Sequence, residues 1–268
     1  MTADLAVKER TRRHAGATRD YTHAAGLYGY RVNYASQVVR CLAAFVGAHR
    51  PGFRVADIGA GTGKLTAMLS DLGAAGVAVE PNAAMRAEGI RLTGEAARFE
   101  WRDGTGERTG LPEASVDWVC VGTAFHLFAI EEALREFRRI LKPGGAVTAI
   151  WVLPDEDLCP LVQSVEATLE ARHPGLDRLI RKVYATWPQM DRWLGPGAGF
   201  RERFYIDAWQ AEPMSPERYL GIWRGQADVP LQITPQQWQD TLAALWELVK
   251  DRPEVAPIYR TRAWTARV

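Results

Sequence analysis

A glycine-rich segment at residues 55–64, VADIGAGTGK, has the composition in this sequence that best suits ligand chemistry. Its glycines at positions 59, 61 and 63 allow a ligand to approach the backbone without meeting Cβ atoms. Lys64 begins an expected helix, and the free N–H groups at the start of a helix suit a carboxylate or a phosphate. The segment therefore predicts a ligand site at the point where a strand meets a helix.

Two phosphate-binding patterns do not fit this segment. A dinucleotide fold has the pattern G-x-G-x-x-G, but here the third glycine comes one residue early and Lys64 stands in its place. A P-loop begins with glycine and ends in Gly-Lys followed by Ser or Thr. Here Ile58 stands at the position of the first glycine, and Leu65 stands at the position of the Ser or Thr.

Glu80, at the end of the next expected strand, can accept both hydroxyls of a ribose, as acids do in nucleoside-binding sheets.

The elements that must position these residues alternate between strands and helices. Strands are expected at 54–58, 76–79, 97–101, 116–122 and 147–152, with helices at 64–72, 82–92 and 130–141 between them. This alternation predicts a parallel, doubly wound α/β sheet whose core covers residues 50–152. Outside that core, helical patterns are expected at 21–49, 155–195, 216–223 and 235–250, and strands at 203–209 and 258–268.

The motifs together resemble class I S-adenosylmethionine-dependent methyltransferases. DIGAGTGK followed by VAVEPNAAM resembles their first two motifs. Further similar segments are DGTGERTGLPEASVDWV (103–119), GTAFHLF (122–128), RRILKPGGAV (138–147) and YGYRVNYA (28–35). The subgroup that the chain most resembles is the small-molecule enzymes similar to trans-aconitate methyltransferase. Val32 and Ala35 replace two prolines, and Leu127 replaces a Trp of that pattern, so we expect a different acceptor.

The resemblance implies a Rossmann-like sheet of seven strands, mostly parallel with an antiparallel last strand, plus a helical lid. Residues 1–18, which include Lys8 and Arg10, are expected to be a basic N-terminal arm. Residues 19–268 are expected to form a single methyltransferase domain, with the lid from 19–49 and 155–225 and the C-terminal strand at 257–268.

The resemblance also implies a site for S-adenosylmethionine, with S-adenosylhomocysteine as the product. Asp57 and the glycines would hold the methionine end, and Glu80 would take the ribose hydroxyls. The implied cofactor-binding residues are Tyr28, Arg31, Asp57, Gly59, Ala60, Gly61, Gly63, Glu80, Asn82, Met85, Thr105, Gly106, Glu107, Thr123 and Ala124. In many relatives an Asp stands at the position of Thr105.

Methyl transfer from a sulfonium needs positioning and exclusion of water more than activation, and a base only for an acceptor that keeps its proton. His126, just past the fourth expected strand, is the candidate base, with a packing role as the alternative. Tyr21 is a second catalytic candidate. The chain holds ten tryptophans, most of them after residue 150, which favours an aromatic-lined pocket. The candidate substrate-binding residues are Trp151, Trp187, Trp223 and Arg224.

Charge and cysteine content narrow the possible partners. The formal net charge of +1 over 268 residues argues against nucleic acid and acidic membranes as partners. Three scattered cysteines favour a reducing, cytoplasmic compartment, and no metal is expected. We expect a small-molecule acceptor, aromatic or apolar, methylated on O, N or C, and a homo-oligomer is possible. The alternatives are a protein or RNA methyltransferase and a protein that binds the cofactor without transferring a methyl group.

Overall fold

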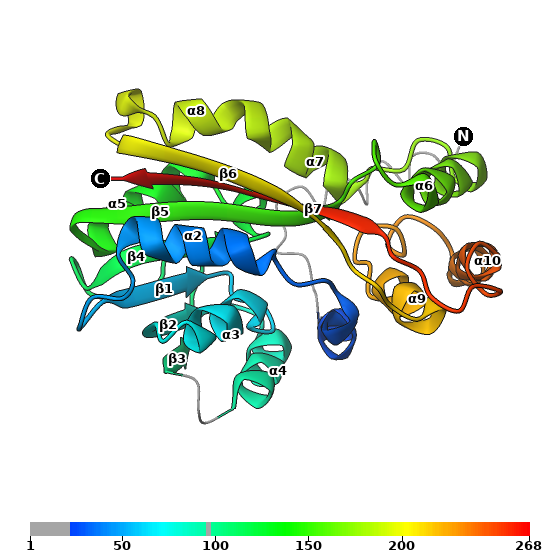
Figure 1. Ribbon diagram of the computed structural model, residues 1–268, viewed down its shortest axis with the longest axis horizontal. Coiled ribbons are helices and arrows are strands. Elements are labelled where there is room, and N and C mark those ends of the chain that lie inside the picture. Colours follow the sequence, from blue (N-terminus) through cyan, green and yellow to red (C-terminus); the bar gives the residue numbers. More distant parts are fainter. Residues whose placement is uncertain (1–21, 95–97) are drawn as a thin grey trace.

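The computed structural model describes residues 22–94 and 98–268, and its centre is a seven-stranded sheet (Figure 1). The strand order is β3-β2-β1-β4-β5-β7-β6. The strands are β1 (Arg54–Ile58), β2 (Ala75–Val79), β3 (Phe99–Arg102), β4 (Val116–Gly122), β5 (Leu141–Pro154), β6 (Arg201–Ala211) and β7 (Ile258–Arg267). Only β7 runs antiparallel to its neighbours in this sheet. The fold predicted from the sequence is therefore confirmed.

Helices cover both faces of the sheet, because its central strands are apolar on both sides. One face carries α2 (Ser36–Val46) and α3 (Lys64–Asp71), whose buried side chains pack on Val55 and Trp118. The other face carries α5 (Ile130–Ile140), α7 (Leu179–Thr186) and α8 (Met190–Trp193), which share a core with Val119 and Trp151. A further helix, α4 (Ala83–Thr93), packs against β3.

A third hydrophobic core lies beyond the sheet, among α6 (Pro160–Arg172), α9 (Pro216–Arg224) and α10 (Pro235–Glu247). We call these three helices the cap. Strands β5 and β6 run parallel and lead into α6 and α9, so the cap lies at the carboxyl edge of the sheet, at the right of Figure 1. A 3₁₀ helix, η1 (Thr22–Tyr30), contacts both α9 and α4.

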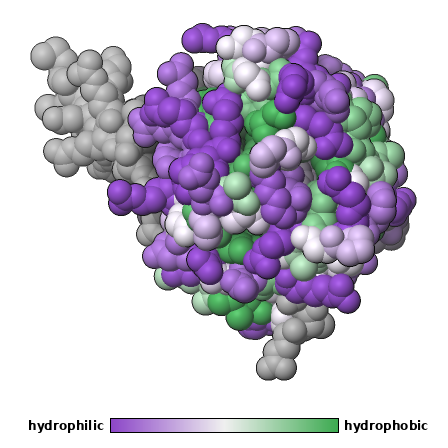
Figure 2. Space-filling model, turned by 90° about the vertical axis from the view of Figure 1, so that its left-hand side faces the viewer, coloured by the Kyte–Doolittle hydropathy of each residue, from purple (hydrophilic) through white to green (hydrophobic). Residues whose placement is uncertain are grey.

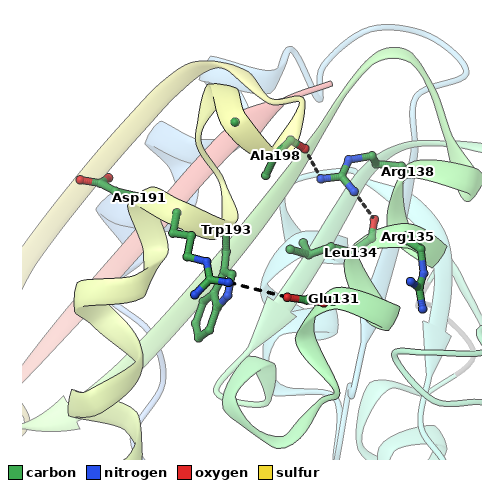
Figure 3. A pocket seen from close by; sticks show the side chains of 9 residues that line it. Glu131, Leu134, Arg135, Arg138, Asp191, Trp193 and Ala198 are labelled. Atoms are coloured by element: carbon green, nitrogen blue, oxygen red, sulfur yellow. Dashed lines mark hydrogen bonds and ion pairs between the residues drawn. The ribbon is translucent and has the colours of Figure 1, made fainter.

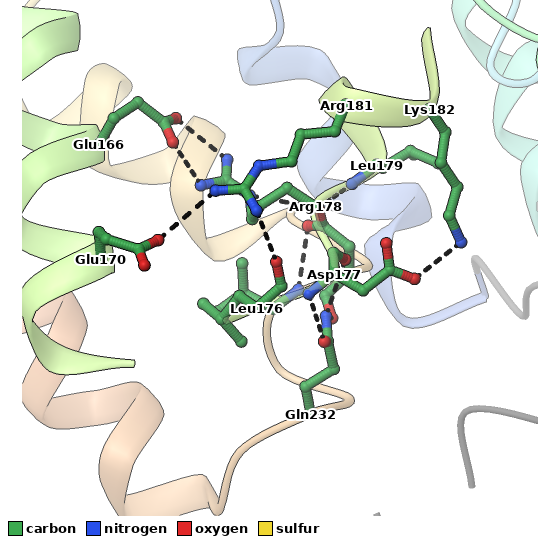
Figure 4. A network of polar contacts seen from close by, with 11 residues as sticks. Glu166, Glu170, Leu176, Asp177, Arg178, Leu179, Arg181, Lys182 and Gln232 are labelled. Atoms are coloured by element: carbon green, nitrogen blue, oxygen red, sulfur yellow. Dashed lines mark hydrogen bonds and ion pairs between the residues drawn. The ribbon is translucent and has the colours of Figure 1, made fainter. Parts of the chain in front are cut away.

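Buried charge ties the cap to α7. The Arg178 guanidinium donates to both carboxylate oxygens of Glu166, over 2.8 and 3.2 Å, and lies 3.5 Å from Asp228 (Figure 4). Asp228 also accepts from the Leu179 N–H at the start of α7.

Hydrophilic side chains predominate on the face shown in Figure 2, which lies at the end of the molecule opposite the cap.

The prediction of a single helix at 21–49 is wrong, because the chain is extended between η1 and α2. Tertiary partners take the backbone groups that a continuous helix would use: Lys64 Nζ donates to the Arg31 carbonyl over 2.6 Å, and the Ala35 N–H donates to Thr261 Oγ1 over 2.9 Å. Helix α2 consequently belongs to the layer that covers the sheet, while η1 contacts α9.

Two further expectations differ from the structure in extent. Strand β5 begins at Leu141, before the strand expected at 147–152, and Gly144 adopts a φ of 76° within a break in the β4–β5 register. The expected lid ended at residue 225, but Trp238 and Leu242 of α10 pack in the core of the cap. The basic arm at 1–18 lies outside the described residues.

Candidate functional site

The glycine turn after β1 is bonded to the tip of the neighbouring strand β2. The N–H groups of Gly59 and Ala60 donate to the Val79 carbonyl over 2.8 and 3.1 Å. The buried carboxylate of Glu80 accepts from the Gly61 N–H and the Asn82 N–H, both over 2.9 Å. Glu80 therefore holds the two strand tips together, and its oxygens keep further lone pairs for donors from a ligand.

The three glycines of the turn have different neighbours, and the difference identifies the side that faces a ligand. A Cβ atom at Gly59 would lie 2.8 Å from Ala124 Cβ, and one at Gly63 would lie 3.0 Å from the Trp101 ring, so both glycines serve packing within the protein. A Cβ at Gly61 would meet only Met85 Cε, at 3.9 Å. Gly61 therefore borders open space where a ligand can reach the backbone, and this cradle fits the predicted cofactor.

Asp57 lies beneath the turn, fully buried at the end of β1. Its Oδ2 accepts from Thr66 Oγ1 over 2.6 Å, and within the described chain its Oδ1 has no hydrogen-bond partner. Burial raises the pKa of this carboxyl to about 7, the Thr66 bond lowers it, and Glu80 raises it. In this structure Asp57 supports the turn from below, because no part of the side chain is exposed.

The residues predicted for the adenine pocket lie in turns that follow β2 and β3. Asn82 caps α4, since its Oδ1 accepts from the Met85 N–H over 3.0 Å. Thr105 forms a turn with Arg108. Glu107 Oε1 accepts from the Ala129 N–H over 2.8 Å, at the residue that precedes α5. The Glu107 carboxylate thus caps a helix in this structure, as negative charge commonly does at a helix start.

Gly106 packs closely against an aromatic ring. A Cβ at this position would come within 2.8 Å of the Phe128 ring. The tight contact fixes the path of the loop between β3 and β4, so that the loop can form one wall of the site.

The end of β4 is held by Tyr34, which lies in the segment 28–35. Thr123 adopts a φ of 51°, an uncommon conformation for a residue with a Cβ, and its N–H donates to the Ile150 carbonyl over 2.7 Å. The Tyr34 hydroxyl lies 3.1 Å from Thr123 Oγ1. A Cβ at Gly122 would come within 2.6 Å of the same hydroxyl oxygen. Tyr34 therefore positions Thr123, and Ala124 follows next to Gly59.

The front of the site is closed by η1 and the extended segment after it. The Arg31 guanidinium lies 4.5 Å from the centroid of the Tyr28 ring and donates to the Gly225 carbonyl over 3.2 Å. Lys64 donates to the Arg31 carbonyl and to Asn33 Oδ1 over 2.6 and 3.1 Å. No role in the site was predicted for Lys64, although its place directly after the glycine turn was the signal that could have indicated one.

His126 lies in a short 3₁₀ helix, η2 (Phe125–Leu127), and its Nδ1 accepts from Trp151 Nε1 over 3.4 Å. A neutral imidazole that accepts at Nδ1 carries its proton on Nε2. In this arrangement, accepting a proton at Nδ1 would require the bond from Trp151 to break. The geometry favours the orienting role over that of a general base.

The predicted substrate-binding residues do not gather in one place. Trp151 is fully buried on the α7 side of the sheet, and Trp187 follows α7 in η3 (Trp187–Gln189) on the same side. Trp223 is buried in the cap, and Arg224 is exposed at the end of α9. Tyr21 lies outside the described residues.

A separate hollow of about 680 Å³ lies between α5, α8 and η4 (Pro196–Ala198) (Figure 3). Arg138, Glu131 and Trp193 line it, and none of its lining residues belongs to the predicted site. In the part of the chain that the structure describes, no group of three or more His, Cys, Asp or Glu side chains could hold a metal ion. Each helix described is too short or too polar to cross a membrane.

Known proteins share both the sequence motifs and the fold of this chain. Residues 56–149 match the family profile described as a methyltransferase domain. A methyltransferase of Schizosaccharomyces pombe is 32% identical over 153 residues, which cover 55% of each chain. The ubiquinone/menaquinone C-methyltransferase of Rubrivivax gelatinosus is 34% identical over 99 residues, 37% of this chain and 39% of that protein. This chain thus spans about half the length of the first of these relatives and less of the second.

Solved structures agree in fold. A protein of Anabaena variabilis, described as a methyltransferase from an antibiotic biosynthesis pathway, has a TM-score of 0.56 at 21% identity, covering 87% of this chain and 98% of its own. A protein of Anaeromyxobacter dehalogenans, described as a type II methyltransferase, has a TM-score of 0.52 at 21% identity, covering 88% and 97%. The match of residues 56–149 to a methyltransferase domain agrees with the class predicted from the motifs.

Proposed function

We propose that this chain binds S-adenosylmethionine at the glycine turn and transfers its methyl group to a small acceptor beneath the cap. The observation that carries the proposal is the cradle at Gly61, open on one side and bordered by the carboxylate of Glu80. Bound there, the cofactor supplies a methyl group on a sulfonium, which passes in line to the acceptor atom while sulfur keeps the bonding electron pair.

The protein residues would bind, orient and exclude water. Glu80 would accept the ribose hydroxyls, and the turn at Asn82 would border the adenine. The cap and η1 would shield the acceptor from water, which strengthens electrostatic interactions in the site. His126, which accepts from Trp151, would help to form the wall of the site near the acceptor. An acceptor that loses a proton on methylation would then release it to solvent or to another group.

A small molecule is the acceptor that the chain supports best. Val32 and Ala35, which replace the prolines of the entry motif, are buried in the cap core and in the core that contains α2. Because these residues depart from the pattern of enzymes similar to trans-aconitate methyltransferase, we propose a different acceptor. The three free cysteines support a cytoplasmic location. A protein or RNA acceptor and cofactor binding without methyl transfer remain outcomes of the tests below.

Calorimetric titration of the purified protein with S-adenosylhomocysteine, alongside NAD, tests the cofactor. We expect micromolar binding of the first and none of the second. Binding of NAD in preference would overturn the proposal. Release of labelled methyl groups to small acceptors, and not to protein or RNA, then separates the proposed acceptor class from the alternatives.

Substitution of Gly61 by alanine tests the position of the cofactor. The new Cβ would fill the open side of the cradle, so we expect Gly61→Ala to weaken S-adenosylhomocysteine binding at least about a hundredfold, or about 2.7 kcal/mol. Gly73→Ala is the matched control, because Gly73 also has a positive φ and open space around it but lies at the end of α3. Equal affinity in the two variants would contradict the placement.

A further inference from the structure

Arg262, in β7, is a largely buried arginine whose hydrogen-bond donors are not used within the described residues. Its side chain is 20% exposed and its Nε is buried without a partner. The nearest carboxylate, Asp207, lies 4.0 Å away, because Arg260 binds that carboxylate through two nitrogens and the Tyr205 hydroxyl also donates to it. The fixed fork of the Arg262 guanidinium is therefore available to another acceptor.

The surroundings of Arg262 are aromatic and contain a second unused donor. The Trp187 ring lies 4.2 Å from the guanidinium carbon, and Trp187 Nε1 is buried without a hydrogen-bond partner in the described chain. The Tyr184 ring packs 4.9 Å from Trp187. Two buried donors thus lie next to each other against aromatic rings, a combination that is costly unless an acceptor satisfies it.

This cluster lies beside the candidate methyl-transfer site. Arg262 is paired with Trp151 across the β5–β7 ladder, and side chains of directly paired antiparallel residues share a face of the sheet. Trp151 in turn donates to His126. The neighbouring residue Ile150 accepts from Thr123, so Arg262 lies two strands from the end of β4, about 10 Å at the usual strand spacing. That interval matches the length of a molecule with one or two rings.

We infer that Arg262 and Trp187 form an anion subsite that binds a carboxylate of the acceptor, which is therefore an aromatic or aryl-alkyl acid. The inference rests on the proposed function and names its substrate class. A planar carboxylate matches the guanidinium fork. A more highly charged anion fits less well, because Asp155 and Asp207 lie on the same side of the site and only one guanidinium is available.

Acid and amide pairs of the same shape test the subsite. We would titrate benzoate, phenylacetate and indole-3-acetate, each against its amide, into the full chain saturated with S-adenosylhomocysteine, and follow calorimetry and tryptophan fluorescence. At least one acid should bind at least about tenfold more tightly than its amide. Arg262→Gln should abolish that preference and leave the amide and S-adenosylhomocysteine affinities unchanged.

Two further variants make the result decisive. Arg262→Lys keeps the charge without the fork, so it should keep a weakened preference for the acid, and it covers the case in which Arg262→Gln fails to fold. Arg203→Gln removes an exposed arginine that pairs with Asp191, and it should change nothing. Acids that bind no better than their amides, or a preference that survives in Arg262→Gln, would overturn the subsite. Failure of S-adenosylhomocysteine itself to bind would instead overturn the proposed function.

Discussion

Two carboxylates at the tips of neighbouring strands, Asp57 and Glu80, have different roles because their exposure and partners differ. Glu80 is close to the cradle. Burial raises its pKa, and the bonds that it accepts from two backbone N–H groups lower the pKa only in part. Asp57 is fully buried and has one hydroxyl donor, so its pKa reaches about 7. Glu80 is thus suited to contact a ligand as an anion, whereas Asp57 supports the turn.

The raised pKa of Asp57 makes stability depend on pH. Between its unfolded value of 3.8 and about 7, the folded state keeps a proton that the unfolded state has lost. The stability contribution is therefore full below the unfolded pKa and is lost as the pH rises to about 7. We expect Asp57→Asn, which is neutral at every pH, to raise the unfolding temperature of the cofactor-free protein more at pH 8.5 than at pH 5.5.

We compare the change in unfolding temperature at the two pH values because any pH-independent effect of the buried amide on stability then cancels. Each kcal/mol gained should shift the unfolding temperature by about 2–4 °C for a chain of this size, as scanning calorimetry can measure. Asp71→Asn, an exposed change at the end of α3, is the control. The same gain at both pH values would show that Asp57 does not titrate in this range.

At the scale of single residues, the sequence was sufficient to predict contacts that depend on the positions of residues at the ends of strands. The glycine turn and Glu80 meet as expected, because the ends of adjacent parallel strands are neighbours. The free donors of Arg262 could not be predicted, since the sequence cannot show that Arg260 takes the carboxylate of Asp207. Trp151 was expected in a pocket wall, but its side chain is fully buried in the structure.

At the scale of elements, the sheet core was predictable because β1, β2 and β4 are short and mainly apolar. Strands β1 and β4 begin and end at the residues expected. The break between η1 and α2 was not predictable, because its hydrogen-bond partners, Lys64 and Thr261, lie about 30 and 230 residues further along the chain. The helical pattern at 21–49 depends only on the spacing of apolar side chains, and it contains no information on these distant backbone partners.

Lys64 links α3, the glycine turn and the extended segment 31–33. We expect Lys64→Met to leave the Arg31 carbonyl without its donor, at a cost of about 1–3 kcal/mol, and to loosen that segment. Hydrogen exchange should become faster at 28–35 and stay unchanged in α2, whose buried face packs on the sheet. Binding of S-adenosylhomocysteine should weaken by about tenfold, or 1.4 kcal/mol.

A lysine at the other end of the sheet provides the control for this variant. Lys142 donates to Asp117 at the start of β4, so Lys142→Met should change neither exchange at 28–35 nor the cofactor affinity. Unchanged exchange at 28–35 in Lys64→Met would mean that other contacts, such as the bond from Arg31 to Gly225, suffice to hold the segment.

At the scale of the whole molecule, the buried residues form three cores, two on the faces of the sheet and one in the cap. Val152 of β5 packs against both the cap core and the core that contains α2. The proposed lid can open while the sheet stays folded only if the lid has a hydrophobic core of its own. Regions that unfold locally are those held together mainly by contacts within the region. The composition of the sequence gave no sign of it, since the cap comes from separate stretches of chain.

The buried cluster around Arg178 tests whether the cap opens by itself. Its side chain is 7% exposed and lies between Glu166 of α6 and Asp228, which is 4% exposed. Arg178→Met would leave two carboxylates without their cation, a change that typically costs about 3–5 kcal/mol. We expect native-state hydrogen exchange to show a loss of that size in α6 and α9, with protection in β1 and β4 unchanged. Arg181→Met, which breaks an exposed pair with Glu170 and a 3.5 Å bond to the Leu176 carbonyl, should cost less than about 1 kcal/mol. An equal loss of protection in the cap and the sheet would mean that they unfold as one unit, and closure would then have to involve η1 alone.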